Sequence, residues 1–343
     1  MTAIQEMLAD DILNRVLVVA PLKVCTDTWA YEHTQWSHLR PVAVATGSEA
    51  QRRAVIEGDA QVVVINFENL PWLFATYADR HGFDGLVIDE LTRMASGGAQ
   101  FKALRKRLGD FVWRVGMTGT LVEEGLDRLF YQVMCLDNGR RFGRNKARWL
   151  QQYFVPLDWE ARRWGPQEGA SERLAAQLDG LVYEARMVAS DGVPELVEET
   201  VFVTLSPRAT EAYANMCLHM IAEGVEAANA AVASGKLQQI CSGFMYSGDE
   251  VSDLGDFKFR CLSPILAGGG QALVVYQFVD ELARLRVAYP DGRELRDTGA
   301  VDAWNAGKLG VLFLHPASGG HGLNLQASGC GLVVFLGPLW SSD

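Results

Sequence analysis

Short apolar runs alternate with amphipathic stretches along the first third of the chain. The runs are nearly all apolar, as expected of strands that are buried on both faces of a parallel sheet, and lie at Val16–Ala20, Val42–Ala45, Val62–Ile65, Leu86–Ile88 and Val112–Gly116. Helical stretches are predicted at Thr2–Ala9, Thr28–Leu39, Glu49–Ile56, Leu70–Tyr77 and Gln100–Leu108. This strand–helix alternation predicts an α/β domain with a parallel sheet.

A second alternating block follows a segment of different composition. Residues 151–194 are rich in tryptophan and charge and hold no apolar strand run, which is typical of a connector. Beyond it we expect strands at Val201–Leu205, Leu273–Tyr276, Val311–Leu314 and Leu332–Leu336, and helices at about 207–223, 225–241 and 256–266. The chain is therefore predicted to form two α/β lobes, residues 1–155 and 195–343, with a connector at 156–194. Ligands should bind in a cleft between the lobes, at the carboxyl ends of the strands.

The composition is that of a globular protein. Of 343 residues, 49% are hydrophobic and 21% are charged, which excludes disordered and collagen-like chains. No apolar run approaches the roughly 18 residues that span a bilayer, and the N-terminal segment lacks the basic start of a secretory signal. The six cysteines include no Cys-x-x-Cys pair, which argues against a zinc ribbon or a disulfide framework. These features predict a cytoplasmic protein without a membrane partner.

Charge is distributed unevenly along the chain. The net charge is −11, which disfavours a nucleic-acid binder, yet residues 93–163 hold 14 Lys and Arg against 7 Asp and Glu. The densest basic segment is 139–148, which includes Arg140, Arg141 and Arg144. It is interpreted either as a site for the phosphate backbone of DNA or as an ordinary solvated surface.

Polar residues that could take part in catalysis or binding follow two consecutive predicted strands. Asp89 and Glu90 come directly after the run that ends at Ile88, and Thr118-Gly119-Thr120 follows the next run. Adjacent carboxylates at the end of a buried strand are costly unless they bind something. The pair is therefore interpreted as a Walker B site, in which Asp89 binds Mg²⁺ through water and Glu90 polarises the attacking water. The alternative is a strand that ends in a charged loop.

Six segments, taken in order, resemble one family over essentially the whole chain. They are Ala20-Pro21-Leu22, Val87–Glu90, Thr118–Thr120, Lys236–Ile240, Leu273–Phe278 and Ala317–Leu325. The fourth segment resembles a helix of the Swi/Snf branch. The other five resemble, in order, motifs Ia, II, III, IV and V of the superfamily-two DNA helicases. The amino-acid sequences of these segments are similar to those of phage-type Swi/Snf proteins. The resemblance implies two RecA-like lobes of the P-loop NTPase fold that hydrolyse ATP with Mg²⁺ and act on double-stranded DNA.

The same resemblance assigns roles to individual residues. Asp89 would bind magnesium and Glu90 would activate water. The residues that would contact the nucleotide or couple it to the second lobe are Thr118, Gly119, Thr120, Gly319, Gly320, Gly322 and Asn324. Besides Arg140, Arg141 and Arg144, the residues expected at the DNA backbone are Lys23, Asn66 and Ser318.

Two departures from the family pattern bear on catalysis. The 343 residues contain no Gly-x4-Gly-Lys-Ser/Thr phosphate loop, and the arginines of motif VI are expected beyond the last residue, Asp343. We therefore expect an incomplete core, which on its own hydrolyses ATP slowly or not at all. The alternative is a catalytically inactive DNA- or protein-binding remnant. An unrelated Mg²⁺-dependent phosphohydrolase is disfavoured because no second carboxylate cluster accompanies Asp89.

Two tryptophans in the predicted helix 28–39 could belong either to a hydrophobic core or to a base-stacking platform. Trp29 and Trp36 are seven residues apart, which suits one face of a helix. Aromatic side chains at this spacing belong to a hydrophobic core more often than to a base-stacking platform. We therefore predict that Trp29 and Trp36 are both core residues.

Overall fold

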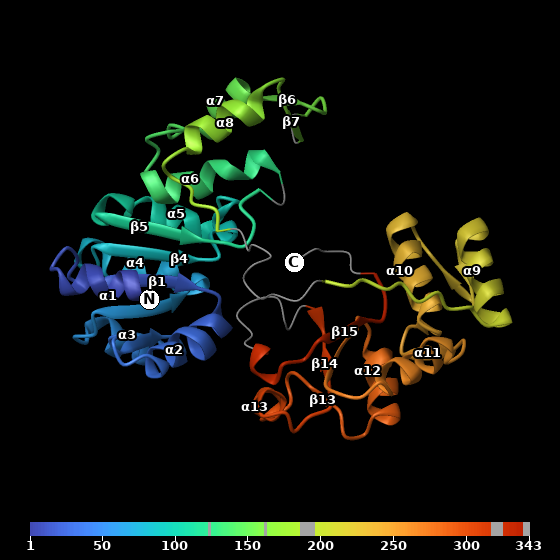
Figure 1. Ribbon diagram of the computed structural model, residues 1–343. Coiled ribbons are helices and arrows are strands. Elements are labelled where there is room, and N and C mark those ends of the chain that lie inside the picture. The colour runs from blue at the N-terminus through green and yellow to red at the C-terminus, as the bar shows by residue number, and fades with distance from the viewer. Residues whose placement is uncertain (123–124, 161–162, 186–195, 317–324, 339–343) are drawn as a thin grey trace. The chain divides into compact units, whose positions relative to one another are not determined.

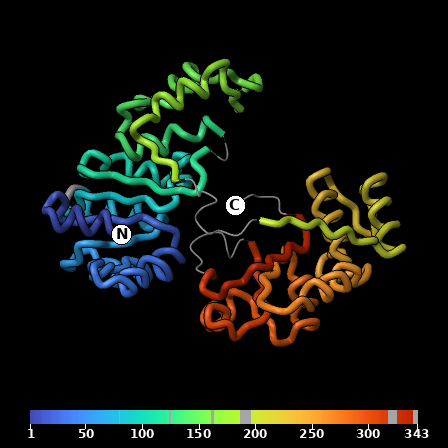
Figure 2. The backbone as a smooth tube through the Cα atoms, viewed as in Figure 1, coloured from blue at the N-terminus to red at the C-terminus, as the bar shows by residue number. Residues whose placement is uncertain are grey.

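The computed structural model describes residues 1–122, 125–160, 163–185, 196–316 and 325–338 (Figure 1). The chain divides into two compact units, Met1–Asp191 and Gly192–Asp343, and each is built on a parallel sheet flanked by helices. In Figure 2 the blue-to-green residues form the first unit and the yellow-to-red residues form the second. The predicted fold class, α/β with two tandem parallel sheets, is confirmed.

The first unit is organised around a five-stranded parallel sheet with the strand order β2-β3-β1-β4-β5. Its strands coincide with the five predicted runs to within one residue: β1 Val16–Ala20, β2 Val42–Ala45, β3 Val62–Asn66, β4 Gly85–Asp89 and β5 Trp113–Met117. The central strand β1 pairs with β3 and β4, so that Val19 lies beside Ile65 on one side and Ile88 on the other. Because all five strands run in one direction, their carboxyl ends meet at one edge of the sheet.

Each face of this sheet packs against its own hydrophobic core. On β1, Leu17 and Val19 belong to one core, whereas Val16, Val18 and Ala20 belong to the other. The larger core receives residues from α3 (Glu49–Glu57), α4 (Leu70–Thr76), α5 (Ala99–Arg105) and α6 (Leu129–Asp137). The smaller core receives residues from α1, Thr2–Ala9. Burial of both faces explains why the strand runs are almost purely apolar.

The segment predicted as a single helix at 28–39 folds differently. A π-helical turn, Val24–Trp29, precedes a short helix α2, Ala30–Gln35, and the backbone at Trp36 is already extended. Trp29 is buried in the smaller core as predicted, but Trp36 is 55% exposed, so the prediction for Trp36 was wrong. Seven-residue spacing places two side chains on one face only within a continuous α-helix, and this helix ends before Trp36.

The first unit continues beyond α6 into a smaller layer. Its elements are α7 Lys146–Tyr153, β6 Phe154–Pro156, β7 Trp164–Pro166 and α8 Ala170–Leu178. Trp149 lies at its centre, with its ring centroid 5.3 Å from that of Phe130 and 5.1 Å from that of Phe154. Leu174 of α8 is buried in the same core, so residues up to α8 pack on the first unit.

The second unit contains a four-stranded parallel sheet with the order β13-β14-β12-β15. The strands are β12 Ala272–Val275, β13 Arg293–Glu294, β14 Val311–Leu314 and β15 Leu332–Phe335. The helices α12, Val279–Ala288, and α13, Ala300–Asn305, bury Leu285 and Trp304 in its cores, and Phe313 of β14 is also fully buried. The strands predicted near residues 273, 311 and 332 are therefore present.

A helical part precedes this sheet, and two predictions there were wrong. Its elements are α9 Pro207–His219, α10 Ala230–Cys241, α11 Phe257–Leu266, and the antiparallel hairpins β8–β9 (Ile221–Ala222, Val225–Glu226) and β10–β11 (Phe244–Ser247, Glu250–Asp253). The helix expected at 225–241 begins only at Ala230, because Gly224 turns the chain with φ 74° and the Asn229 side chain caps α10. The strand expected at Val201–Leu205 does not form. Val203 and Leu205 pack inward, but Phe202 is 92% exposed and no described strand pairs with this segment.

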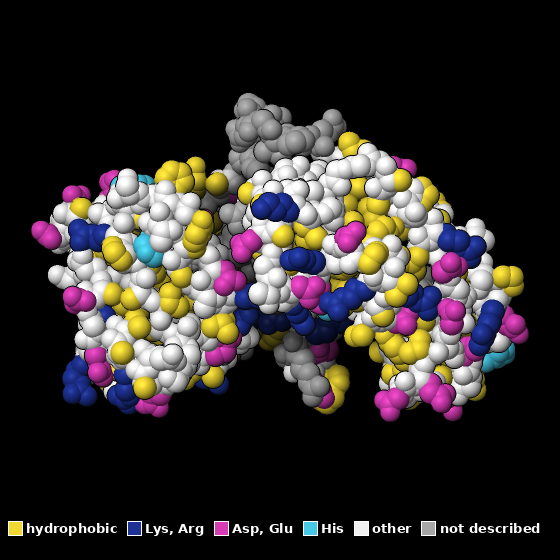
Figure 3. All heavy atoms as spheres, turned by 90° about the horizontal axis from the view of Figure 1, so that it is seen from below, with side chains coloured by type: hydrophobic (Ala, Val, Ile, Leu, Met, Phe, Trp, Pro, Cys, Tyr) yellow, Lys and Arg dark blue, Asp and Glu magenta, His cyan; other side chains and the backbone are white. Residues whose placement is uncertain are grey.

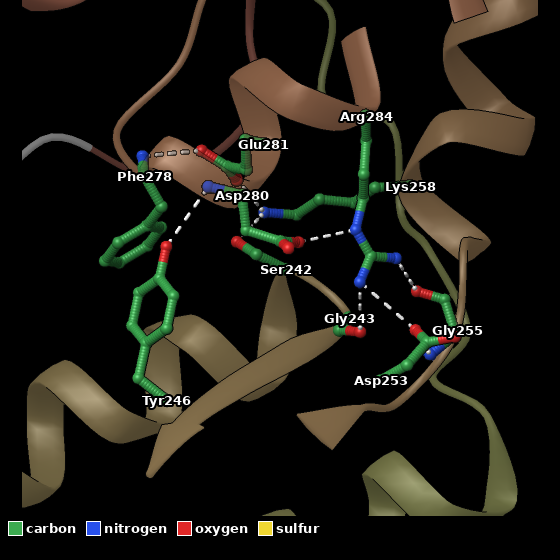
Figure 4. A network of polar contacts seen from close by, with 10 residues as sticks. All are labelled: Ser242, Gly243, Tyr246, Asp253, Gly255, Lys258, Phe278, Asp280, Glu281 and Arg284. Carbon is green, nitrogen blue, oxygen red and sulfur yellow. Dashed lines mark hydrogen bonds and ion pairs between the residues drawn. The ribbon is translucent and has the colours of Figure 1, made fainter. Parts of the chain in front are cut away.

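A polar network fastens the helical part to the second sheet (Figure 4). The guanidinium of Arg284, on α12, donates to Asp280 Oδ2 at 2.5 Å, to Asp253 Oδ1 at 3.1 Å and to the carbonyl of Gly255 at 3.1 Å. Lys258 Nζ, on α11, donates to Ser242 Oγ at 2.9 Å and lies 3.7 Å from the buried carboxylate of Glu281. Burial lowers the pKa of Lys258, although the Glu281 charge opposes that shift. The network therefore joins α11, α12 and the β10–β11 hairpin through charged hydrogen bonds.

The carboxylate of Asp84 ties the loop before β1 to the start of β4, and its removal should destabilise the first unit. It accepts hydrogen bonds from Asn14 N at 2.9 Å, Asn14 Nδ2 at 2.7 Å and Arg15 N at 3.0 Å. Burial alone would raise the pKa of Asp84, but these backbone and side-chain donors lower it. We expect Asp84→Ala to reduce the free energy of unfolding by about 2 kcal/mol at pH 7, measured by urea denaturation.

The pH dependence of the unfolding free energy tests whether the charged form of Asp84 is responsible. Because the folded pKa of Asp84 lies below its unfolded value, the stabilisation is present above the unfolded value and is lost as the pH falls through the folded one. The difference between wild type and Asp84→Ala should therefore shrink below about pH 4. Asp10→Ala, at an exposed position in the same unit, should show neither effect. A difference that stays constant down to pH 3 would contradict the role of the charged carboxylate.

Candidate functional site

The carboxyl edge of the first sheet gathers several of the polar residues that the sequence singles out in this unit. Asp89 is the last residue of β4, Glu90 follows it, and Thr118 comes directly after β5. The strands β4 and β5 are neighbours, and Asp89 pairs with Met117 in the ladder. Asn66 ends β3, on the other side of β1. The topology therefore brings the two carboxylates and the threonine turn together, whatever their separation in sequence.

Asp89 is held by a buried tryptophan. Trp29 Nε1 donates a hydrogen bond to Asp89 Oδ2 at 2.8 Å, and the tryptophan is 5% exposed. The Asp89 side chain itself is half-buried at the edge of the sheet. Burial raises the pKa of the nearby Cys25 thiol to about 12, and the charges of Asp89 and Glu68 add to that shift. The thiol is therefore neutral, and negative charge collects around this edge.

Glu90 has an unusual backbone and a fixed side chain. Its φ of 73° and ψ of 69° place it in the left-handed region, which a non-glycine residue adopts only when its surroundings enforce it. Its N–H donates to the carbonyl of Met117 at 2.9 Å. Two hydroxyls donate to the same carboxylate oxygen, Oε1: those of Thr92 and, at 2.8 Å, Thr118. The strained backbone and these donors together define the direction of the Glu90 carboxylate.

The Thr118-Gly119-Thr120 turn is organised around one hydroxyl. Thr118 Oγ1, besides its bond to Glu90, accepts a hydrogen bond from Thr120 N at 3.3 Å. Gly119 and Thr120 are exposed, whereas Thr118 is half-buried. A shift of the turn would therefore move a hydrogen-bond donor of the Glu90 carboxylate.

A second polar group lies at the carboxyl end of β3. Asn66 is only 6% exposed; its Nδ2 donates to Glu68 Oε2 at 2.7 Å and its Oδ1 accepts from Asn69 Nδ2 at 2.5 Å. Burial alone would raise the pKa of Glu68, but hydrogen bonds from Asn66 and Arg93 lower it. Arg93 Nη2 lies 2.9 Å from Glu68 Oε1. The amide of Asn66 would have to give up these internal bonds to contact DNA, whereas the predicted contact Lys23 is exposed.

The donor set fits magnesium that arrives with a nucleotide. Among the described residues, no group of three or more His, Cys, Asp or Glu side chains could hold a metal on its own. Asp89 and Glu90 do provide carboxylate oxygens, which are the donors that Mg²⁺ prefers. This ion is commonly held by one or two carboxylates together with phosphate oxygens and water. Asp89, at the strand end, is the residue that would hold it.

The three arginines of the basic segment that were predicted to contact DNA differ in their surroundings. Arg140 and Arg144 are exposed. Arg141, in contrast, donates through Nε to the carbonyl of Gln177 at 2.8 Å, and its Nη1 lies 3.7 Å from the buried carboxylate of Asp137. That carboxylate also accepts from the backbone N–H groups of residues 139, 140 and 141. Arg141 is thus part of the internal structure of this loop.

Charged side chains of both signs are interspersed with apolar ones over the face shown in Figure 3. With 42 Asp and Glu against 31 Lys and Arg, the chain as a whole is acidic, so a nucleic acid would have to be bound by local basic groups such as Arg140 and Arg144.

Some predicted positions cannot be placed, and some contacts were not foreseen. The predicted residues Ser318, Gly319, Gly320, Gly322 and Asn324 lie outside the described residues. The bonds of Trp29 to Asp89 and of Thr92 to Glu90 were not predicted from the sequence. Thr92, two residues after Glu90, could have been found as a local hydroxyl partner, but Trp29 is 60 positions from Asp89. Helices in the described part of the chain are all too short or too polar to cross a membrane.

Comparison with known proteins gives one relative over the full chain. No protein-family model matches. The chain is 33% identical to "Putative protein p41" of Acyrthosiphon pisum secondary endosymbiont phage 1, an alignment that covers 100% of this chain and 79% of that protein. Among solved structures, the SWI2/SNF2 ATPase core of Sulfolobus solfataricus in complex with double-stranded DNA is 20% identical, with a TM-score of 0.48, over 97% of this chain and 73% of that one. The helicase Lhr of Mycobacterium smegmatis, bound to single-stranded DNA and AMP-PNP, is 13% identical, with a TM-score of 0.43, over 94% of this chain and 36% of that one.

Proposed function

We propose that this chain, which belongs to the same family as putative protein p41 of that phage, forms the core of an ATP-dependent, Swi/Snf-type translocase on double-stranded DNA. The observation that carries the proposal is the 2.8 Å hydrogen bond from Thr118 Oγ1 to Glu90 Oε1. It joins the carboxylate pair at the end of β4 to the threonine turn after β5, two segments that resemble successive helicase motifs. If phage-encoded, the protein acts in the host cytoplasm.

The carboxyl edge of the first sheet supplies the groups that ATP hydrolysis needs from this unit. Magnesium, when bound with the nucleotide, neutralises charge that develops on the phosphates. Asp89 would hold that ion, through water. Glu90 orients the attacking water and accepts its proton, because its carboxylate direction is set by Thr92 and Thr118. Thr118 then links the state of the nucleotide to the turn that ends at Thr120.

The contacts to the other partners follow from the family resemblance. We propose that Gly319, Gly320, Gly322 and Asn324 approach the nucleotide from the second unit. The glycines suit this position because the backbone must come close to phosphate. In the first unit, Lys23, Arg140 and Arg144 are the exposed cations that we assign to the DNA backbone.

Reversing the two exposed arginines should weaken DNA binding and its salt dependence. Each phosphate contact contributes about 0.9 to the slope of log affinity against log salt concentration. We expect Arg140→Glu combined with Arg144→Glu to lower the magnitude of the slope by about 2, measured by fluorescence anisotropy with a labelled duplex. Arg53→Glu, which alters an exposed i,i+4 pair with Glu49 on α3, is the matched control. An unchanged slope in the double variant would show that this segment is an ordinary solvated surface.

Translocation itself is tested by displacement of a third strand from a DNA triplex. A protein that moves along the duplex should release the third strand only when ATP and Mg²⁺ are present. ATPγS should not replace ATP. Binding to the duplex without any ATP-dependent displacement would instead identify a catalytically inactive DNA-binding protein.

A further inference from the structure

The hydrogen bond between Trp29 and Asp89 joins two segments that lie far apart in sequence. Trp29 ends the π-helical turn after β1, and Asp89 ends β4, the neighbouring strand. The Nε1–Oδ2 distance of 2.8 Å is that of a well-formed hydrogen bond to a charged acceptor. Trp29 is 5% exposed and packs in the smaller core of the first unit, so its ring position is fixed.

The local backbone explains how the indole reaches the carboxylate. The chain leaves β1 at Ala20 and enters a π-helical turn, Val24–Trp29, before α2 begins. A π-helical turn contains more residues than an α-helical one, which changes the direction of the side chain at its end. Such turns occur frequently at functional sites. Here the turn buries Cys25 and aims the Trp29 N–H at the edge of the sheet.

The chemistry of the donor matters as well as its position. An indole N–H is a donor only, and it carries no charge. It can therefore orient a carboxylate without neutralising it, whereas a lysine or arginine at the same place would form an ion pair that competes with a cation. Groups that orient a metal-binding side chain in this way change metal affinity by about 10–100-fold when they are removed.

We propose that Trp29 is a positioning residue that orients the Asp89 carboxylate for the magnesium ion of the nucleotide. The inference rests on the proposed function, since it assumes that Asp89 holds that ion. It assigns to Trp29 a role beyond packing. The ring fills the core, and its N–H sets the affinity of the neighbouring site for a divalent cation.

The direct test measures cation binding by Trp29→Phe, which keeps an aromatic ring but removes the N–H donor. Mn²⁺ serves as the probe in the presence of ATPγS, and the free ion is counted by electron paramagnetic resonance. We expect Trp29→Phe to bind Mn²⁺ about 10-fold or more weakly than the wild type. The matched control is Trp36→Phe, which removes an indole hydrogen bond to Glu32 at an exposed site and should bind Mn²⁺ like the wild type.

The possible outcomes separate this inference from the proposed function. If folded Trp29→Phe binds Mn²⁺ as tightly as the wild type, the positioning role is overturned while the proposed function stands. If the wild type binds no Mn²⁺ with ATPγS, the magnesium role of Asp89 fails, and the inference fails with it.

A second measurement covers the case in which Trp29→Phe does not fold. In the ¹⁵N-tryptophan spectrum of the wild type, the Trp29 indole signal is assigned through its contacts with neighbouring side chains. It should shift in Asp89→Asn, which keeps an acceptor but loses the charge, and it should broaden when Mn²⁺ is added with ATPγS. An indole signal that responds to neither change overturns the inference.

Discussion

Glu90→Gln should reduce DNA-stimulated ATP hydrolysis by about 10²–10⁴-fold while leaving ATP binding intact. Glutamine keeps the shape of the side chain and can still accept hydrogen bonds from Thr92 and Thr118, but it cannot take a proton from water. The loss therefore reports on proton acceptance and not on the architecture of the site. The rate is measured by phosphate release with saturating duplex DNA, and binding is measured with a fluorescent ATP analogue.

If the gene encodes more than residues 1–343, the longer product is used for this comparison, because an incomplete core would turn over slowly. The control is Glu49→Gln, which removes an exposed ion pair with Arg53 on α3 and should leave the rate unchanged. If Glu90→Gln hydrolysed ATP at the wild-type rate, water would have to be activated elsewhere. The assignment of Glu90 would then be wrong.

Arg141→Glu should destabilise the first unit strongly, by about 3 kcal/mol. The guanidinium faces the Asp137 carboxylate, which is 5% exposed, and also donates to the carbonyl of Gln177 on α8. A glutamate at this position would bring a second negative charge toward a buried one and leave that carbonyl without its donor. The free energy of unfolding, measured by urea denaturation, should fall accordingly.

The neighbouring residue provides the control for this prediction. Arg140 is exposed, so Arg140→Glu should change the unfolding free energy by no more than about 0.5 kcal/mol, yet it should weaken duplex binding. The two variants change charge by the same amount at adjacent positions. Equal stability of both would contradict the structural role of Arg141.

The strands of the first sheet could be predicted because they depend on the local sequence pattern. The proximity of the carboxylates to the threonine turn could be predicted from a simple rule of sheet topology. A run such as Val16–Ala20, apolar at every position and rich in valine, is typical of a strand that is covered on both faces. Parallel strands then bring their carboxyl ends to one edge, so Asp89 and Thr118 had to lie close together. No knowledge of side-chain contacts was needed for either step.

The rest depends on long-range contacts that a linear pattern does not contain. The apolar run at 201–205 satisfies a strand pattern, but a strand also needs a neighbour, and none pairs with this segment in the described part of the chain. The late start of α10 could have been predicted from the sequence, since Gly224 and the capping residue Asn229 are both recognisable signals. The charge count grouped Arg141 with Arg140, because a count does not show that the guanidinium of Arg141 faces the buried Asp137 carboxylate.

Trp29 shows the same limit at the site itself. Its spacing from Trp36 predicted a shared helical face, but the π-helical turn and the early end of α2 separate the two residues. The hydrogen bond to Asp89 depends on the order of β1 and β4 in the sheet as well as on that turn. Neither feature is visible as a motif.

Iron-mediated cleavage of the chain would locate the nucleotide's metal ion directly. Fe²⁺ replaces Mg²⁺, and with ascorbate and peroxide it generates radicals that cut the backbone beside its ligands. If the carboxyl edge of the first sheet is the nucleotide site, ATPγS should induce cleavage next to Asp89 and near Thr118, which directly follows the paired strand, and Asp89→Asn should abolish it. Cleavage elsewhere in the chain, or cleavage at this edge that persists in Asp89→Asn, would contradict the assignment of this edge as the site of ATP hydrolysis.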